Sequence, residues 1–275
     1  MSDETAIIPR PWFAALIYML LALGSLVPLL AEPIVVRYKE GVSRGFLVVC
    51  TPDGKQIGFG DAFQVANGDK VTSRMIFHFK DGSVDDETTI FSQSGSFRLL
   101  NDHVLQKGPA FKQPMETWID TANKKVMVRH TDKDGKANVV PQELDLPPDL
   151  SNGLLLTFLK NIDSRTPKTT VSYLAATPKP RIVTLVITPD GEQRFIAGSA
   201  RHSAQRYNVK VDIGGAAGVV AHVIGKQPPD TKIWMSTGEA PSFAGLVGPF
   251  FGDHDVWRIN LASPILPKNP EQTKP

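Results

Sequence analysis

Asx-Gly dipeptides recur along this chain between short apolar runs, and their spacing constrains the fold more than any other feature. They occur at Asp53-Gly54, Asn67-Gly68, Asp81-Gly82, Asp134-Gly135 and Asp190-Gly191. Asx-Gly favours the tight turns of β-hairpins, because the central residues of such turns need positive φ. We therefore expect an antiparallel sheet built from consecutive hairpins.

The runs between these turns alternate in polarity, as strands with one buried face do. In the run at 71–79, apolar Val71, Phe77 and Phe79 alternate with polar residues such as His78. The same alternation predicts strands at 206–213 and 256–261, and weaker patterns predict strands at 87–92, 96–106, 115–120, 125–131, 137–142, 169–176 and 181–188. The predicted fold is mainly β, with a large curved antiparallel sheet or a partly closed barrel.

One segment has the spacing of a helix rather than a strand. Its apolar residues, spaced three or four apart, are Leu150, Leu154, Leu155, Phe158, Leu159 and Ile162. They would share one stripe of a helix, and either Asp149 or Ser151 could cap its first turn. We predict an amphipathic helix at about 149–162, packed on the sheet.

That helix divides a β region of residues 32–262 into two parts, at about 33–146 and 168–262. Each part contains Thr-Pro-Asp-Gly after a β-branched apolar run, at Thr51–Gly54 and at Thr188–Gly191. Both copies read as hairpins. They could record a duplication that gave two similar halves, but turn chemistry selects these residues in any case and is the default interpretation.

The beginning of the chain is apolar. Residues 12–27 contain no charge and no proline, and Arg10 is the one basic residue before them. Residues 1–31 fit a secretory signal peptide ending at Ala31, and the run 12–31 is also about as long as the ~20 residues of a membrane-spanning helix. Both readings place the rest of the protein in the periplasm or outside the cell, either released or anchored in the inner membrane through 12–31. At the other end, the Pro-rich residues 263–275 are expected to be a flexible tail.

Composition excludes several classes of function. With 30 basic and 28 acidic residues spread along 275 positions, the chain has no basic cluster that would bind nucleic acid. The single cysteine, Cys50, excludes an intrachain disulfide and a cysteine-based metal site, and reads as a buried small hydrophobe. The glycines at 214–225 match no phosphate-binding motif, and no histidines have metal-ligand spacing. We expect no metal and no cofactor.

Catalytic candidates are few. His254 stands between Asp253 and Asp255, and these three residues are the first to suspect in an enzyme. No further converging groups can be named, so a polar turn before the strand at 256–261 is the preferred interpretation. The acidic residues Asp85, Asp86 and Glu87 are interpreted as a solvated stretch after a turn.

Aromatic residues give the better indication of binding. Phe243, Phe250, Phe251 and Trp257 cluster near the C-terminus, and the Gly- and Pro-rich segment 242–251 is apolar for a loop. An exposed apolar loop is typical of a ligand mouth or of a contact with a membrane or protein. These four residues are the predicted ligand-binding candidates.

Taken together, the apolar start, the antiparallel meander and the single helix resemble secreted bacterial proteins with curved, partly closed sheets, among them the periplasmic lipoprotein carriers. The resemblance covers residues 44–262 and implies an apolar half-barrel that holds an acyl chain. Our first hypothesis is an exported or membrane-anchored non-enzymatic β protein that binds an apolar small molecule or lipid, or an envelope protein. The alternatives are an envelope hydrolase with a site near His254, and a structural or assembly protein that pairs through a sheet edge.

Overall fold

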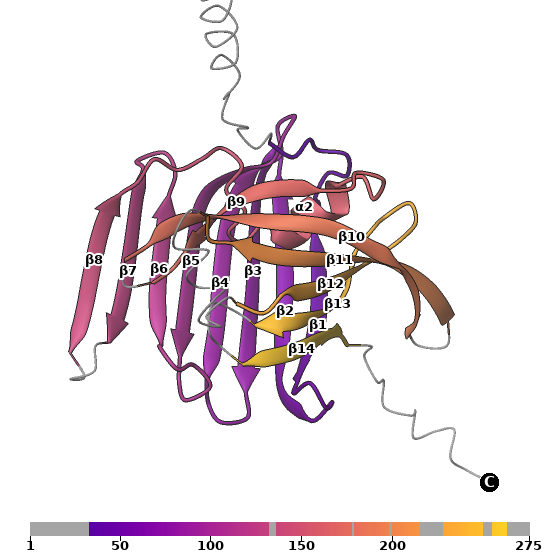
Figure 1. The fold of residues 1–275 in the computed structure, drawn as a ribbon, viewed down its shortest axis with the longest axis horizontal. Coiled ribbons are helices and arrows are strands. Elements are labelled where there is room, and N and C mark those ends of the chain that lie inside the picture. Colours follow the sequence, from indigo (N-terminus) through magenta and orange to yellow (C-terminus); the bar gives the residue numbers. More distant parts are fainter. Residues whose placement is uncertain are drawn as a thin grey trace, which may run out of the picture. The chain divides into compact units, whose positions relative to one another are not determined.

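The described part of the protein is one antiparallel sheet with one short helix (Figure 1). The computed structural model describes residues 33–131, 136–177, 179–197, 200–214, 228–249 and 255–262. The first eight strands are β1 (Ser43–Cys50), β2 (Gln56–Asn67), β3 (Lys70–Phe79), β4 (Val84–Ser92), β5 (Arg98–Lys107), β6 (Met115–Asp120), β7 (Lys125–Thr131) and β8 (Ala137–Glu143). The helix α2 (Leu155–Asn161) follows, and then β9 (Thr169–Ala175), β10 (Arg181–Ala197), β11 (Ala200–Asp212), β12 (Thr231–Ser236), β13 (Phe243–Pro249) and β14 (Val256–Leu261). The predicted fold class, mainly β with an antiparallel sheet and one helix, is confirmed.

The order of the strands shows how the two halves of the sheet are joined. The strands run β8 to β1 and then β14 to β9, so both halves are simple meanders that meet where β1 pairs with β14. In that pairing Leu47 lies opposite Leu261 and Val49 opposite Ile259. The strands β8 and β9 follow each other in sequence, yet they form the two opposite edges of the sheet. The segment that contains α2 therefore carries the chain from one edge to the other.

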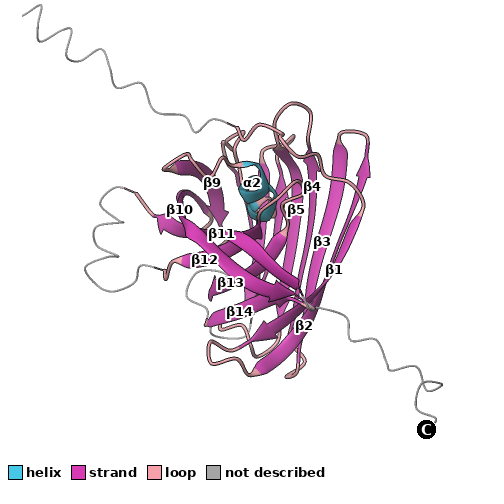
Figure 2. Ribbon diagram, turned by 90° about the vertical axis from the view of Figure 1, so that its right-hand side faces the viewer, coloured by secondary structure: helices cyan, strands magenta, loops and turns pink. Residues whose placement is uncertain are grey.

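The sheet curves so that its two halves face each other (Figures 1 and 2). One apolar core joins Val71 of β3 and Ile119 of β6 to Val171 of β9 and Ile233 of β12, and all four side chains are buried. Phe158 of α2 is fully buried in the same core, between the layers. Residues from both halves thus exclude water from one common interior.

Alternation located most strands correctly. The predicted strands at 115–120 and 125–131 coincide with β6 and β7, and Val71, Phe77 and Phe79 are buried on one face of β3. The sequence analysis predicted neither β12 nor β13. Strand β13 covers residues 243–249, where an apolar loop was expected at 242–251, so the loop prediction is wrong for these residues.

The two Thr-Pro-Asp-Gly copies have different structures. The first is the predicted hairpin turn between β1 and β2, in which the Thr51 N–H donates to the Lys55 carbonyl at 2.9 Å. The second is not a hairpin, because β10 continues through it to Ala197 with a bulge between Pro189 and Glu192. The neighbouring strand β11 stabilises this bulge through an ion pair of Arg206 with Asp190 at 2.8 Å.

The helix is shorter than predicted. Residues 149–154 form turns and a β-bridge between Leu150 and Ser172, and α2 begins only at Leu155, without a side-chain cap. Asp149, Ser151 and Asn152 instead bond to the backbone of β9 at the edge of the sheet. Gly153 has a positive φ of 64°, which interrupts any helix that starts earlier. The predicted start at 149 and the predicted caps are therefore wrong.

The structure does not describe the apolar N-terminal segment, the tail 263–275 or the turn at Asp134-Gly135. Within the described ranges, no helix is long and apolar enough to cross a membrane. Residues 32–275 form a compact unit separate from Met1–Ala31, and every strand, core residue and hydrogen bond described here lies within it.

Candidate functional site

A cavity of about 650 Å³ lies between the two halves of the sheet. Strands β1 to β4, strands β9 to β14 and the helix α2 all contribute to its lining. Most of the wall is apolar, with Leu47, Met75, Phe77, Leu185, Val209, Met235 and Leu246 among the lining residues. The volume falls within the range of about 300–1,000 Å³ that is usual for small-molecule sites.

Small residues on the inner faces of β1 to β3 leave this space open. Gly45 pairs with Ala62, Ala62 pairs with Met75, and Ser73 follows on the same face of β3; all four residues line the cavity. Phe59 and Val65 of β2 lie on the other face and are 55% and 52% exposed. At these positions the usual arrangement of a strand is reversed, because small side chains point inward and large apolar ones point to solvent.

A group of carboxyl side chains lies at the boundary between the cavity and the solid core. Asp85 and Glu87 come from alternate positions of β4 and line the cavity, as does Tyr173 of β9. Asp102 comes from the neighbouring strand β5 and accepts a hydrogen bond from Thr89 at 2.8 Å. Asp85 accepts one from Gln106 at 2.7 Å. Asp85 and Asp102 are each only 2% exposed.

Burial makes these acids unusually weak. Desolvation raises the pKa of Asp85 to about 7, against the opposing effect of the Gln106 hydrogen bond. Desolvation also raises the pKa of Asp102 to about 7. Glu87 lies near both carboxyls, so burial and then the charges of Asp102 and Asp85 hold its pKa well above the usual range. The Tyr173 pKa is raised as well, by burial and then by the same three acids.

The expectation that residues 85–87 form a solvated stretch is therefore wrong for two of the three. In β4 the side chains alternate, so Asp85 and Glu87 point to the interior together with Thr89 and Phe91. Asp86 points outward, where the Arg74 guanidinium donates to both of its oxygens at 2.8 and 2.6 Å.

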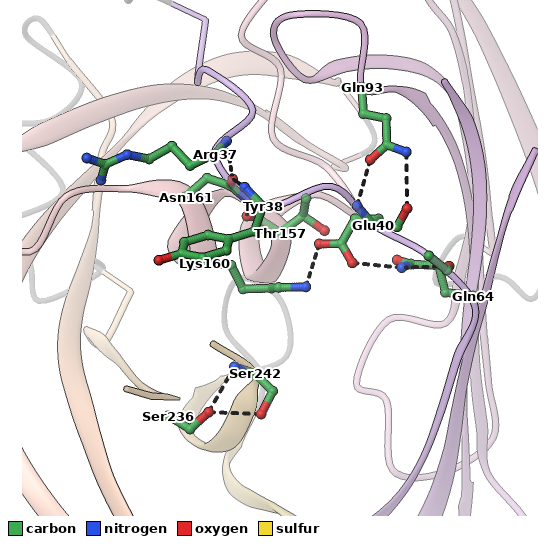
Figure 3. Close-up of polar contacts among 11 residues, drawn as sticks. Arg37, Tyr38, Glu40, Gln64, Gln93, Thr157, Lys160, Asn161, Ser236 and Ser242 are labelled. Atoms are coloured by element: carbon green, nitrogen blue, oxygen red, sulfur yellow. Dashed lines mark hydrogen bonds and ion pairs between the residues drawn. The ribbon is translucent and has the colours of Figure 1, made fainter. Parts of the chain in front are cut away.

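A polar network includes three residues that line the cavity, Glu40, Gln64 and Lys160, and Figure 3 shows its contacts. The Glu40 carboxylate accepts hydrogen bonds from Lys160 of α2 at 2.7 Å and from Gln64 of β2 at 2.8 Å. The Gln93 side-chain amide bonds to both the N–H and the carbonyl of Glu40, at 2.7 and 3.1 Å. Asn161 accepts from the backbone N–H groups of residues 37 and 38, both at 2.8 Å. The segment 37–41 is thus fixed to both the sheet and the helix.

The structure places the predicted site residues in different surroundings. Phe243 lines the cavity. Trp257 packs against Phe79 with ring centroids 4.9 Å apart, in a second core cluster. The Asp255 side chain is 72% exposed and lies 3.4 Å from the Lys112 ammonium. Phe250, Phe251, Asp253 and His254 lie outside the described residues.

Sequence reasoning missed the interior acids, although a signal was present. Asp85, Glu87 and Thr89 stand at alternate positions, so they share one face of a strand with Phe91. A large aromatic residue on that face indicates that the face is buried. The position of the acids just after the Asp81-Gly82 turn favoured the solvated interpretation. Among the described residues, no three His, Cys, Asp or Glu side chains are arranged to hold a metal ion.

A second hollow, of about 790 Å³, lies over the opposite face of strands β4 to β8. Trp118 lines it and stacks on His103, with centroids 5.0 Å apart, and the Arg129 guanidinium lies 5.3 Å from the Trp118 ring. We regard the interior cavity as the stronger candidate, because both halves of the sheet enclose it and it contains the acids with displaced pKa values.

No protein-family model and no curated protein matches the chain. The chain is structurally similar to a β-barrel-like protein of a domain of unknown function, DUF1849, from Brucella abortus, with a TM-score of 0.44 and 10% sequence identity. The match covers 84% of this chain and 97% of the Brucella protein.

Proposed function

We propose that this protein is an exported or membrane-anchored binding protein without catalytic activity, which holds an apolar small molecule or lipid inside its curved sheet. The observation that carries this proposal is the apolar cavity of about 650 Å³ between the two halves. An apolar molecule that enters it removes from water both its own surface and the side chains of the wall.

The origin of the cavity supports a binding role. Cores are normally packed without large voids, because empty space forfeits contacts and destabilises the fold. Here Gly45, Ala62 and Ser73 stand side by side at inner positions where larger residues would fill the space. A ligand that occupies the space would recover those contacts.

The test is to purify residues 32–275, extract them with organic solvent and identify bound lipid by mass spectrometry. Uptake of a hydrophobic fluorescent probe is measured on the extracted protein. We expect bound apolar material or probe uptake at about one molecule per chain. A lipid-free protein that also fails to take up the probe would contradict the proposal.

A pair of variants separates the cavity from the outer surface. Ala62→Leu adds volume inside the cavity and should weaken probe binding at least tenfold. Thr72→Leu adds a similar volume at an exposed position of β3 and should leave binding unchanged. Equal binding by both variants would place the probe elsewhere on the protein.

A second candidate function, assembly through a sheet edge, has its own observation. The edge strand β9 is covered, because Asp149, Ser151 and Asn152 bond to its backbone. In the described part of the chain, the other edge strand, β8, pairs with β7 alone. An open edge can accept a strand of another chain, such as an envelope protein or a second copy. Sedimentation of residues 32–275 would test the second copy: self-association that Val139→Lys abolishes would support it.

A further inference from the structure

We propose that the ligand in the cavity carries a protonated amine, and that Glu87 and Asp85, with the Tyr173 hydroxyl beside them, bind this group. This inference rests on the proposed function and names the polar part of the ligand that the apolar wall would hold. It gives Glu87 and Asp85 a role in ligand binding, which folding of the sheet does not require.

The first argument is that two of these acids, Glu87 and Asp102, have carboxyl oxygens without a hydrogen-bond partner in the described structure. Glu87 lines the cavity, and among the described residues no side chain or backbone group forms a hydrogen bond or ion pair with its carboxyl group. Asp102 is 2% exposed, and its Oδ2 atom has no hydrogen-bond partner. A buried carboxyl group without a partner is costly, and a ligand that supplies donors would remove the cost.

The second argument concerns charge. The basic side chains that line the cavity have carboxylates of their own. Lys160 donates to Glu40 at 2.7 Å, Arg44 to Asp61 at 3.1 Å, and Lys39 to Asp69 at 3.0 Å. Asp85 and Glu87 therefore line the cavity with no basic side chain of the described residues paired to them, whereas His103 lowers the pKa of Asp102. A cationic ligand would supply the missing charge.

The third argument discriminates between ligand classes. A fatty acid would add a fourth carboxyl group to three acids whose negative charges already repel one another. An alcohol can donate one hydrogen bond and brings no charge. An alkyl ammonium group offers three donors and a positive charge, which suit the Glu87 and Asp85 oxygens. An amine with an alkyl chain thus complements both the acids and the apolar wall.

Binding of an amine should release protons. The groups that face Glu87 are Asp85 on its own strand, Asp102 on β5 and Tyr173 on β9, whereas its neighbour on β3 is the uncharged Met75. Burial keeps protons on these acids near neutral pH, and an ammonium ion favours the ionised form, so the proton leaves to solvent. The alkyl ammonium group itself stays charged up to a pH of about 10. Affinity should therefore rise as the pH increases from 6 to 8.

The test uses residues 32–275 and competition with a bound hydrophobic fluorescent probe. Dodecylamine, dodecanol and dodecanoate are compared at pH 6 and pH 8, below their micelle concentrations. We expect dodecylamine to displace the probe at concentrations at least tenfold lower than dodecanol at pH 8, with a smaller difference at pH 6. Glu87→Gln should remove this preference by weakening dodecylamine binding to the level of dodecanol, whereas Glu143→Gln, at an exposed position, should behave as wild type.

The outcomes separate this inference from the proposed function. If the probe binds but dodecylamine is no better than dodecanol, or dodecanoate is best, the amine proposal is wrong and the apolar cavity stands. The same conclusion follows if a folded Glu87→Gln variant, checked by circular dichroism, keeps the preference. If the probe does not bind at all, the proposed function fails, and this inference fails with it.

Discussion

At the scale of single residues, the interior acids should make the stability of the protein depend on pH. The Asp85 pKa is about 7 in the folded protein, against an ordinary value of 3.8. Between these values the folded state binds more protons than the unfolded chain, so the free energy of unfolding falls as the pH rises from about 4 to 7. Asp102 acts in the same direction.

The Asp85→Asn variant should lose part of this dependence, because the amide has no proton to release. Thermal unfolding, followed by circular dichroism at pH 5 and pH 8, measures this pH dependence of stability. We expect a lower Tm at pH 8 than at pH 5 in the wild type, and a smaller difference in the variant. Asp255→Asn, which changes a largely exposed carboxyl group, serves as the control. An equal change in Tm between pH 5 and pH 8 in the wild type and in Asp85→Asn would contradict the assignment to Asp85.

A glycine beside the acids should be irreplaceable. Gly153 has a φ of 64°, and a Cβ atom there would lie 1.9 Å from Thr89 Oγ1, the group that donates to Asp102. Gly153→Ala is expected to destabilise the protein by about 2–4 kcal/mol, through backbone strain and overpacking. Gly54→Ala is the matched control, since Gly54 also has positive φ but nothing within 4 Å of the added atom. Urea denaturation should give a much smaller loss for the control, and equal losses would exclude the steric contribution.

At the scale of elements, the short segment before α2 acts as a substitute strand for the edge of β9. The Asn152 side chain accepts from the Leu174 N–H at 2.8 Å and donates to the Leu174 carbonyl at 3.1 Å, in a buried setting. Asn152→Ala leaves both backbone groups unpaired, so we expect a loss of about 2–4 kcal/mol in the free energy of unfolding. Asn123→Ala, at an exposed turn, should cost much less. Hydrogen exchange should also speed up at Leu174 in the Asn152 variant alone.

The same segment shows where sequence reasoning succeeded and where it failed. Strands with one buried face, such as β6 and β7, follow from alternation alone. The start of the helix does not, because Leu150 and Leu154 have helical spacing but the need to satisfy the β9 backbone determines the local structure. In the same way, Asp190-Gly191 is a good hairpin turn in isolation, and only the partner strand β11 makes it a bulge.

The site was harder to predict than the fold for a related reason. The two-residue period of a strand does not determine which face of β4 is buried. Acidic residues by themselves predict a solvent-exposed face. The inward direction of Asp85 and Glu87 is decided by Phe91 and by the strands that pack over them from the second half. The cavity likewise depends on Gly45 and Ala62 meeting across two strands, a contact that appears only in the folded sheet.

At the scale of the whole molecule, the two meanders should unfold together. They meet through the β1–β14 pairing, and the main core takes residues from both, including Val71 and Ile119 from the first and Val171 and Ile233 from the second. Either half alone would expose that face to water, at a cost of about 25 cal/mol for each Å² of apolar surface. Two independently stable domains, one for each half, are therefore not expected.

Single-tryptophan variants of residues 32–275 test this expectation. Trp118 on β6 reports on the first half, and Trp234 on β12, which donates to Gln193 at 2.8 Å, reports on the second. Replacing Trp257 by Phe in both variants removes a ring that packs against Phe79 of the first half and would mix the two signals. Because one core must be broken for either half to unfold, both reporters should give the same urea midpoint, and circular dichroism should give it as well. Two separated midpoints would show that each half folds by itself, and the open cavity between them would then be an interface between domains rather than the interior of one.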